Sequence, residues 1–224
     1  MTEKTNGAAA SGRASATRER IVAAAFALFA ERGYHAVPVR DIAAAVGIKD
    51  ASLYNHFPGK RAIFDAVVAE ALARTRDVFE SQGVMVEPTD DPTGYAGSFE
   101  ETERRVLAGF RHFFADDEMI RLRRFLTMSQ FDDGCAASAY RLVFIEQPTA
   151  IQRTVFEHLM ACGRFALDDA QALAREFHGP VFLLLASGAS WAEAEPLVRA
   201  HLRRFFDMHA IKASEDAATE GEER

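Results

Sequence analysis

Apolar residues recur at helical spacing along this chain, and no segment alternates between apolar and polar positions as a strand would. Ile42 and Val46 lie one helical turn apart, and after Gly47 the same spacing separates Leu53 from Phe57. Each of these two segments is too short to be stable as an isolated helix. A glycine just past the end of a helix favours a left-handed turn. The pattern therefore predicts two short helices that cross at Gly47, a helix-turn-helix.

Longer helices are predicted on both sides of this pair. Thr17 is the expected N-cap of a first helix over residues 17–32. A Pro-Gly step at residues 58–59 ends the second short helix, and a further helix over residues 60–80 leads away from it. Residues 17–62 are thus expected to form a three-helix domain, linked to the rest by the helix that follows.

The remainder of the chain is predicted to be a second helical domain, residues 63–212. Within it, residues 81–98 read as a long loop, and the helix expected over residues 135–163 contains Pro148, which must kink or break it. The small and polar residues 1–16 and the acidic residues 213–224 are expected to be disordered.

The outward face of the second short helix carries only hydrogen-bonding side chains, with a lysine before it and another just past it. Polar residues are normal on a helix surface, so solvation alone would explain any one of them. As a group, they have the size and chemistry to reach phosphates and base edges in a major groove. The set consists of Lys49, Ser52, Tyr54, Asn55, His56 and Lys60.

Charge is distributed unevenly, although the whole chain has a net charge of −7. Residues 1–61 contain nine Lys or Arg and five Asp or Glu, a net charge of +4, whereas the rest has a net charge of −11. Only the part that binds DNA has to neutralise phosphates. A basic N-terminal part on an acidic body is therefore typical of a DNA-binding protein with a separate regulatory domain.

Several spaced motifs together resemble the N-terminal domain of TetR-family transcriptional regulators. The resemblance covers roughly a quarter of the chain, and it implies an all-α fold in which a helical ligand-binding and dimerisation domain follows the helix-turn-helix domain. The motifs are Thr17-Arg-Glu-Arg-Ile21, the helix end from Phe26 to Gly33, Val39-Arg-Asp-Ile-Ala43, Gly47-Ile48, Ser52-Leu-Tyr-Asn-His-Phe57 and Lys60.

The resemblance also implies roles for individual residues. Tyr54, His56 and Lys60 match positions that usually touch operator DNA. Ser52 matches a position close to a base, and Arg40 one that reaches a phosphate or a base.

Two positions depart from the family pattern, which often has Thr before the first short helix and Ser before the second. Pro38 stands at the first and suits a helix start, because its missing N–H would be unpaired there. Lys49 stands at the second, where an ion pair would replace a hydroxyl–phosphate contact and a side-chain cap would be lost.

An effector site is the second expectation from the resemblance. The chain has 18 Phe, which suit either a helical core or a cavity for an apolar or aromatic small molecule. Each candidate taken singly is more often a core residue, and each His a solvated or core-satisfied one. The candidates are Phe110, Phe114, Phe125, Met128, Tyr140 and Phe144, with His112 and His158 as polar contacts. Arg121, Arg123 and Arg124 would fit an anionic ligand, but surface ion pairs are the commoner use.

Dimerisation is the third expectation, since two C-terminal helices carry apolar residues on more than one face. A monomer could not hide both faces of the helices at residues 168–186 and 196–208, so they should form a four-helix interface with a second copy. The predicted interface residues are Leu173, Phe177, Val181, Leu184, Leu197, Ala200, Phe205 and Met208.

Composition predicts a cytoplasmic protein without membrane contact. Hydrophobic residues make up 49% of 224, enough for a sizeable core. The longest uncharged stretch, between Glu176 and Glu193, contains Gly, Pro and His and reads as a buried helix. The N-terminus lacks the apolar segment of a signal peptide. Cys135 and Cys162 are expected to be free thiols, with redox sensing as the alternative.

Catalytic and metal-binding patterns find little support. The seven His are scattered, with no metal-ligand spacing among them, and neither a cofactor motif nor a catalytic triad is recognisable. The carboxylate pairs at Asp132-Asp133 and Asp168-Asp169 lie at helix boundaries, where Asp usually serves as a cap. No metal, no cofactor and no enzymatic activity are predicted.

These features predict a ligand-responsive transcriptional repressor. It would bind double-stranded operator DNA of near-palindromic sequence as a homodimer and be released by a small-molecule effector. An activator, or a ligand-independent DNA-binding or nucleoid protein of the same fold, is the alternative. A helical-bundle enzyme is a more remote one.

Overall fold

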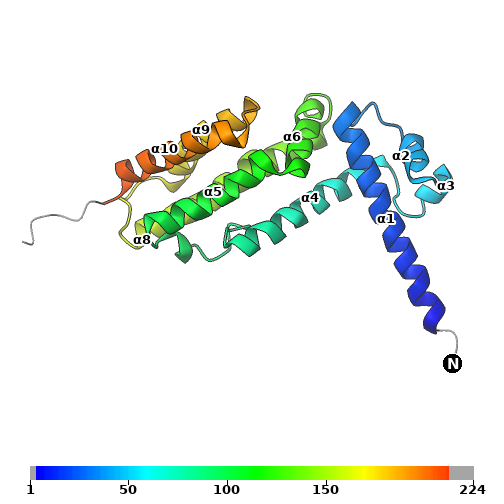
Figure 1. Cartoon of the computed structure of the whole chain (residues 1–224), viewed down its shortest axis with the longest axis horizontal. Coiled ribbons are helices and arrows are strands. Elements are labelled where there is room, and N and C mark those ends of the chain that lie inside the picture. Colours follow the sequence, from blue (N-terminus) through cyan, green and yellow to red (C-terminus); the bar gives the residue numbers. More distant parts are fainter. Residues whose placement is uncertain (1–3, 212–224) are drawn as a thin grey trace, which may run out of the picture. The chain divides into compact units, whose positions relative to one another are not determined.

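The chain is all-α, as predicted (Figure 1). The computed structural model describes the backbone of residues 4–211 and the side chains of residues 12 and 14–211. Within this range it contains no strand, only an isolated antiparallel bridge between Phe165 and Ala210. The α-helices are α1 (Lys4–Arg32), α2 (Val39–Val46), α3 (Asp50–Leu53), α4 (Lys60–Gln82), α5 (Phe99–Ala115), α6 (Asp117–Ser129), α7 (Gly134–Arg141), α8 (Gln147–Ala161), α9 (Ala170–Ala186) and α10 (Trp191–His209). A 3₁₀ turn, η1, covers Thr93–Tyr95, and a π turn, η2, covers Leu142–Glu146.

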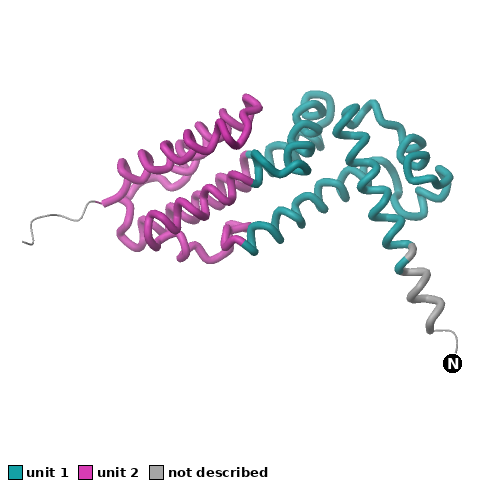
Figure 2. The backbone as a smooth tube through the Cα atoms, viewed as in Figure 1, with its two compact units in different colours: residues 1–81, 112–144 teal, residues 82–111, 145–224 magenta. Residues whose placement is uncertain are grey.

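The helices form two compact units, which Figure 2 shows in different colours. Unit 1 combines the residues up to 81 with residues 112–144, and unit 2 combines residues 82–111 with those from 145 onward. The expected boundary between residues 62 and 63 does not separate these units, since α6 and α7 belong with the helix-turn-helix. The expected acidic tail, residues 213–224, lies outside the described residues.

Unit 1 is built around an aromatic core to which α6 contributes directly. Phe125 of α6 is fully buried, stacks on Phe29 of α1 at 5.4 Å between ring centroids, and meets Phe64 of α4 edge-on at 5.4 Å. Burying three large rings against one another removes much apolar surface from water. This packing explains why α6 and the N-terminal helices form one unit.

Helix α1 begins earlier than the sequence predicted. It starts at Lys4, so residues 4–16, expected to be a disordered arm, are helical and Thr17 lies inside the helix rather than at its N-cap. The alanine-rich composition of this segment explains the extension, because alanine has the highest helix propensity of all residues.

Pro148 interrupts α-helical hydrogen bonding, as predicted, and it does so through a π turn. Helix α7 passes into η2, and α8 then begins with Pro148 in its first turn. Proline has no N–H, and its ring would clash with the carbonyl four residues earlier, here that of Phe144. The wider π turn at Leu142–Glu146 relieves that clash without ending the helical path.

Aspartate caps three helices of the described chain: Asp116 caps α6, and Asp133 and Asp169 cap α7 and α9 as predicted. The Asp133 carboxylate accepts hydrogen bonds from the backbone N–H groups of Cys135 and Ala136 at 2.9 and 2.8 Å. Asp169 accepts one from the N–H of Gln171 at 2.8 Å. Each carboxylate satisfies N–H groups that have no partner within the helix.

Unit 2 has its own aromatic core, formed by α8, α9, α10 and the segment before α9. The ring of Phe156 lies 5.9 Å from that of Phe165, 5.8 Å from that of Phe177 and 5.2 Å from that of Phe205. All four rings are buried, between 1% and 4% exposed. This cluster fixes which sides of α9 and α10 face inward.

Candidate DNA-binding site

The turn between α2 and α3 has the geometry predicted from Gly47. This residue lies in the left-handed region at φ 76° and ψ 32°. Its N–H donates to the carbonyl of Ala44 at 3.1 Å, and the N–H of Ile48 donates to that of Ala43 at 3.0 Å. A side chain at position 47 would be strained at this positive φ. The glycine thus ends α2 and turns the chain toward α3.

Neither short helix has a side-chain cap at its start. Pro38 and Lys49 occupy the two N-cap positions in extended conformations, and no side-chain capping bond forms at either. As predicted, no side-chain cap forms at Lys49. Helix α3 covers only Asp50–Leu53, and the chain continues in turns as far as Phe57, whose N–H donates to the Leu53 carbonyl at 3.0 Å.

The face predicted to contact DNA is open to solvent. Leu53 and Phe57 are buried, as expected, at 0% and 2% exposed. Tyr54 is 55% exposed. Of the other candidates, Arg40, Lys49 and Asn55 are exposed, and Ser52 and His56 are half-buried. The hydrogen-bonding side chains and the lysine predicted on α3 and its following turn are thus wholly or partly open to solvent.

Lys60 differs from the other candidates because it packs against the segment between α1 and α2. Its ammonium group lies 4.4 Å from the centre of the Tyr34 ring and donates to the His35 carbonyl at 3.4 Å. Burial lowers the pKa of Lys60, and the nearby Asp133 opposes that shift. A phosphate contact from Lys60 would replace these interactions.

Two arginines of α1 support the motif and were not found from the sequence. Arg20 donates to the Val46 carbonyl at 2.6 Å, which satisfies a carbonyl at the C-terminus of α2 where a cation is favoured. The guanidinium of Arg18 lies 4.5 Å from the centre of the Phe57 ring. The spacing between either arginine and its partner carries no local signal, so tertiary structure was needed to reveal them.

The segment after α1 is also tied to the end of α6. The Tyr34 N–H donates to the Ser129 hydroxyl at 3.2 Å. The His35 ring lies 3.3 Å from the Asp132 carbonyl oxygen and 3.8 Å from the Asp133 carboxylate. A shift of α6 would therefore displace Tyr34 and His35, which precede the helix-turn-helix.

The predicted effector residues do not gather in one unit. Phe110 and His158 belong to unit 2, where Phe110 meets Phe177 at 6.1 Å, and the other candidates belong to unit 1. Phe125 forms part of the unit 1 core described above, and Met128 of the same helix is 42% exposed. Those that remain in unit 1 are Phe114 and Phe144, both buried, and Tyr140, which is half-buried.

His112 is buried within unit 1 rather than solvated. Its Nε2 lies 3.0 Å from the Thr75 hydroxyl, and its ring meets Phe79 edge-on at 5.5 Å. Burial lowers the pKa of His112, with Asp116 opposing the shift. The neutral imidazole thus links α5 to α4 within unit 1.

Half of the predicted dimer residues face the interior of their own chain. The prediction is wrong for Leu173, Phe177, Val181 and Phe205, which are between 1% and 4% exposed within the single chain. The unit 2 core includes three of them, Leu173, Phe177 and Phe205. The remaining predicted interface residues are accessible. Leu197 and Met208 are 54% exposed, Ala200 is exposed and Leu184 is half-buried. Leu183, which the sequence reading passed over, is 70% exposed.

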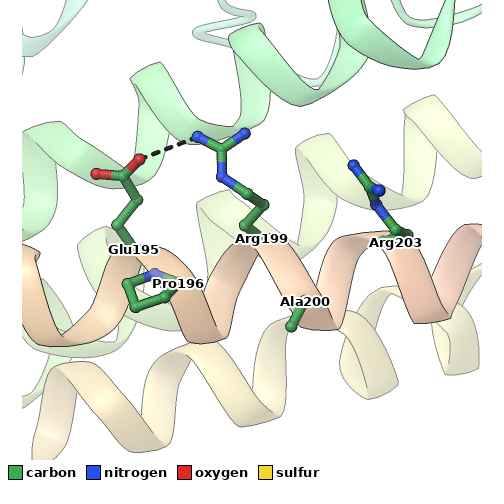
Figure 3. Close-up of a pocket in the computed structure, with 5 residues that line it drawn as sticks. All are labelled: Glu195, Pro196, Arg199, Ala200 and Arg203. Atoms are coloured by element: carbon green, nitrogen blue, oxygen red, sulfur yellow. Dashed lines mark hydrogen bonds and ion pairs between the residues drawn. The ribbon is translucent and has the colours of Figure 1, made fainter.

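A shallow groove of about 370 Å³ lies on α10 (Figure 3). Arg199 pairs with Glu195 at 2.9 Å and with Glu103 of α5 at 2.6 Å. These ion pairs fix the side chain along one wall. The lining residues are Glu195, Pro196, Arg199, Ala200 and Arg203.

The described part of the chain contains no candidate metal site and no candidate membrane span. No group of three or more His, Cys, Asp or Glu side chains is placed to hold a metal ion. None of the described helices combines the length and apolar character needed to cross a membrane.

Comparison with known proteins assigns the N-terminal part of the chain to a family. Residues 21–67 match the family model for bacterial regulatory proteins of the tetR family. The transcriptional repressor KstR2 of Mycobacterium tuberculosis (strain ATCC 25618 / H37Rv) is 40% identical over 74 residues, which are 31% of this chain and 37% of the relative. The chain thus matches little more than a third of that relative's length.

Solved structures resemble nearly the whole chain. A protein from Mesorhizobium loti MAFF303099, assigned to the TetR family, is 23% identical, with a TM-score of 0.66 over 89% of this chain and 99% of its own. The flavonoid-responsive regulator FrrA is 22% identical, with a TM-score of 0.64 over 89% of this chain and 100% of its own. These likenesses support the fold.

The fold and the motif define a helix-turn-helix protein with an additional helical domain. Within it, residues 21–67, which contain the helix-turn-helix, match the tetR family of bacterial regulatory proteins.

Proposed function

We propose that the protein is a ligand-responsive transcriptional repressor that binds a near-palindromic operator as a homodimer. The observation that carries the proposal is the exposed polar face of α3 and its following turn, held behind the Gly47 turn within the segment that matches the family model. Relatives matched over this segment include named repressors, and one structural neighbour is named as flavonoid-responsive. The protein acts by binding rather than by turnover.

Operator recognition divides between two kinds of contact. Ser52, Asn55 and His56 have the donors and acceptors to read base edges in the major groove, and Tyr54 is exposed beside them. Lys49 and Arg40 neutralise phosphates, which sets affinity and register rather than sequence choice. Lys60 joins them as a phosphate contact when it leaves the His35 carbonyl.

Lys49→Ala tests the phosphate role. The substitution is expected to weaken binding to operator and unrelated DNA alike, and to reduce the slope of log affinity against log salt by about 0.9, because one phosphate neutralisation is lost. Binding titrations at several salt concentrations measure that slope. Ser52→Ala is the control, expected to change sequence preference and leave the slope intact. A wild-type slope in Lys49→Ala would remove Lys49 from the contacts.

Dimerisation uses the outer sides of α9 and α10. Leu183, Leu197, Ala200 and Met208 are exposed on these helices in the single chain. A second copy related by a two-fold axis would cover them and present two recognition elements to two half-sites, roughly 34–36 Å or more apart.

Release by an effector follows from the contacts of α6 with the N-terminal helices. Phe125 packs on Phe29 and Phe64, and Ser129 accepts a hydrogen bond from Tyr34. An effector that favours another position of α6 therefore disfavours the DNA-binding arrangement. A coupling of about 1–3 kcal/mol suffices, since it changes operator affinity roughly 5–150-fold.

The proposal is tested by binding of the full chain to the DNA upstream of its own gene, with and without candidate small molecules. A repressor of this kind retards a specific fragment and releases it when its effector is added. An activator would keep or gain affinity with the effector, and equal retardation of all fragments would favour a nucleoid protein. Conversion of a small molecule to a product by the protein would instead support the enzyme alternative.

A further inference from the structure

The guanidinium of Arg123 on α6, in unit 1, is a cation without a paired carboxylate among the described residues. Its Nη1 is buried and has no hydrogen-bond partner, and within the described residues no carboxylate pairs with the guanidinium. The neighbouring Arg121 and Arg124 on the same helix are exposed to solvent, whereas Arg123 is half-buried. An unsatisfied charged donor away from water is unfavourable, so such groups usually have a partner.

The group that interacts electrostatically with Arg123 is a phenol rather than a carboxylate. Burial lowers the pKa of the guanidinium, and the group that opposes this shift is the Tyr140 phenol on α7. The Tyr140 ring lies 5.3 Å from that of Phe144, which in turn lies 6.0 Å from Phe113. We call Arg123, Tyr140, Phe144 and Phe113 the Arg123 cluster.

The backbone at the cluster is irregular as well. Phe144 lies in the π turn, and such turns occur often at functional sites. Pro148 explains why the turn exists, and the turn determines where Phe144 lies relative to Tyr140 one helical turn earlier. Arg123, Tyr140 and Phe113 are all half-buried, so a small molecule has exposed surface to approach.

We propose that the Arg123 cluster binds the anionic end of the effector, and that the effector carries a carboxylate on an apolar, aromatic body. A carboxylate accepts two parallel hydrogen bonds from a guanidinium and a third from a phenol, which would satisfy the buried Nη1. The rings of Phe144 and Phe113 would contact the aromatic body. This inference rests on the proposed function, since it names the chemistry of the effector.

The test compares two probes that differ only in charge, 2-naphthoate and 2-naphthamide. Calorimetry with the full chain is expected to show naphthoate binding about tenfold tighter or more, because charge-assisted hydrogen bonds are the stronger ones. Arg123→Gln should remove this preference. Arg121→Gln and Arg124→Gln are matched controls and should retain it. Equal affinities in the wild type, or a preference that survives in Arg123→Gln, would overturn the proposal.

A second measurement needs no ligand. Arg123→Met keeps the apolar length of the side chain and removes the charge, so the melting temperature of the free protein is expected to stay the same or rise. A clear fall in melting temperature would show that Arg123 is needed for structure, and would count against a binding role.

These assays use no DNA, so their outcome does not depend on operator recognition. If the protein binds no operator but its preference for naphthoate depends on Arg123, the repressor proposal is wrong and the anion site is supported. If an uncharged effector releases operator DNA equally from the wild type and from Arg123→Gln, the anion-site proposal is wrong and the repressor proposal is supported.

Discussion

Replacing both Leu183 and Leu197 with glutamate should convert the dimer to monomers and reduce operator affinity by about 100-fold or more. The two side chains are 70% and 54% exposed in the single chain, so an isolated monomer tolerates the charges. In a dimer the charges would be buried without partners, which is strongly unfavourable. A monomer also loses the gain from occupying two linked half-sites, typically 10²–10⁴-fold. Sedimentation velocity and operator titration measure the two effects.

Two comparison variants separate dissociation from unfolding. Leu167→Glu alters a leucine that is 89% exposed and lies outside α9 and α10, so the dimer and operator binding should both persist. Phe177→Glu places a charge in the unit 2 core and should unfold that unit. A Leu183→Glu/Leu197→Glu protein that stays dimeric and binds operator tightly would show that the interface lies elsewhere.

Phe125→Ala should lower the free energy of unfolding by about 3–5 kcal/mol, the usual result of deleting a buried ring. Phe125 is fully buried and loses contacts with both Phe29 and Phe64, leaving a cavity between α6 and the N-terminal helices. Denaturant titration measures the change.

Met128→Ala is the matched control for that cavity, because Met128 is on the same helix and 42% exposed. Its expected loss is about 1 kcal/mol or less. Similar losses in the two variants would mean that Phe125 does not join α6 to the N-terminal helices.

Local chemistry made the helix-turn-helix predictable from the sequence. A glycine between two short helical segments indicates a left-handed residue at the end of the first helix, and Gly47 has that conformation in the structure. Leu53 and Phe57 point inward because their spacing leaves them on one side of a single turn. Asp133 and Asp169 cap helices through neighbouring N–H groups, which is also a local property.

Contacts between residues far apart in the sequence could not be predicted from the sequence pattern. Helix α9 is apolar on more than one face, and its pattern does not say which face its own chain covers. Phe177 proved to face inward and Leu183 outward. Phe125 fitted an effector pocket by composition, yet it packs on Phe29, a residue far away in sequence. The position of Lys60 on the Tyr34 ring likewise depends on a tertiary contact.

The most direct measurement of the central proposal is the ratio of affinities for specific and unrelated DNA. In vitro selection from random duplexes would supply the preferred site, and a scrambled duplex of equal length the reference, both at one salt concentration. A dimeric operator-binding regulator should select a near-palindrome, bind it at least roughly 10³-fold tighter than the reference, and place two chains on each duplex. Equal affinity for both duplexes, or selection that yields no common sequence, would contradict it.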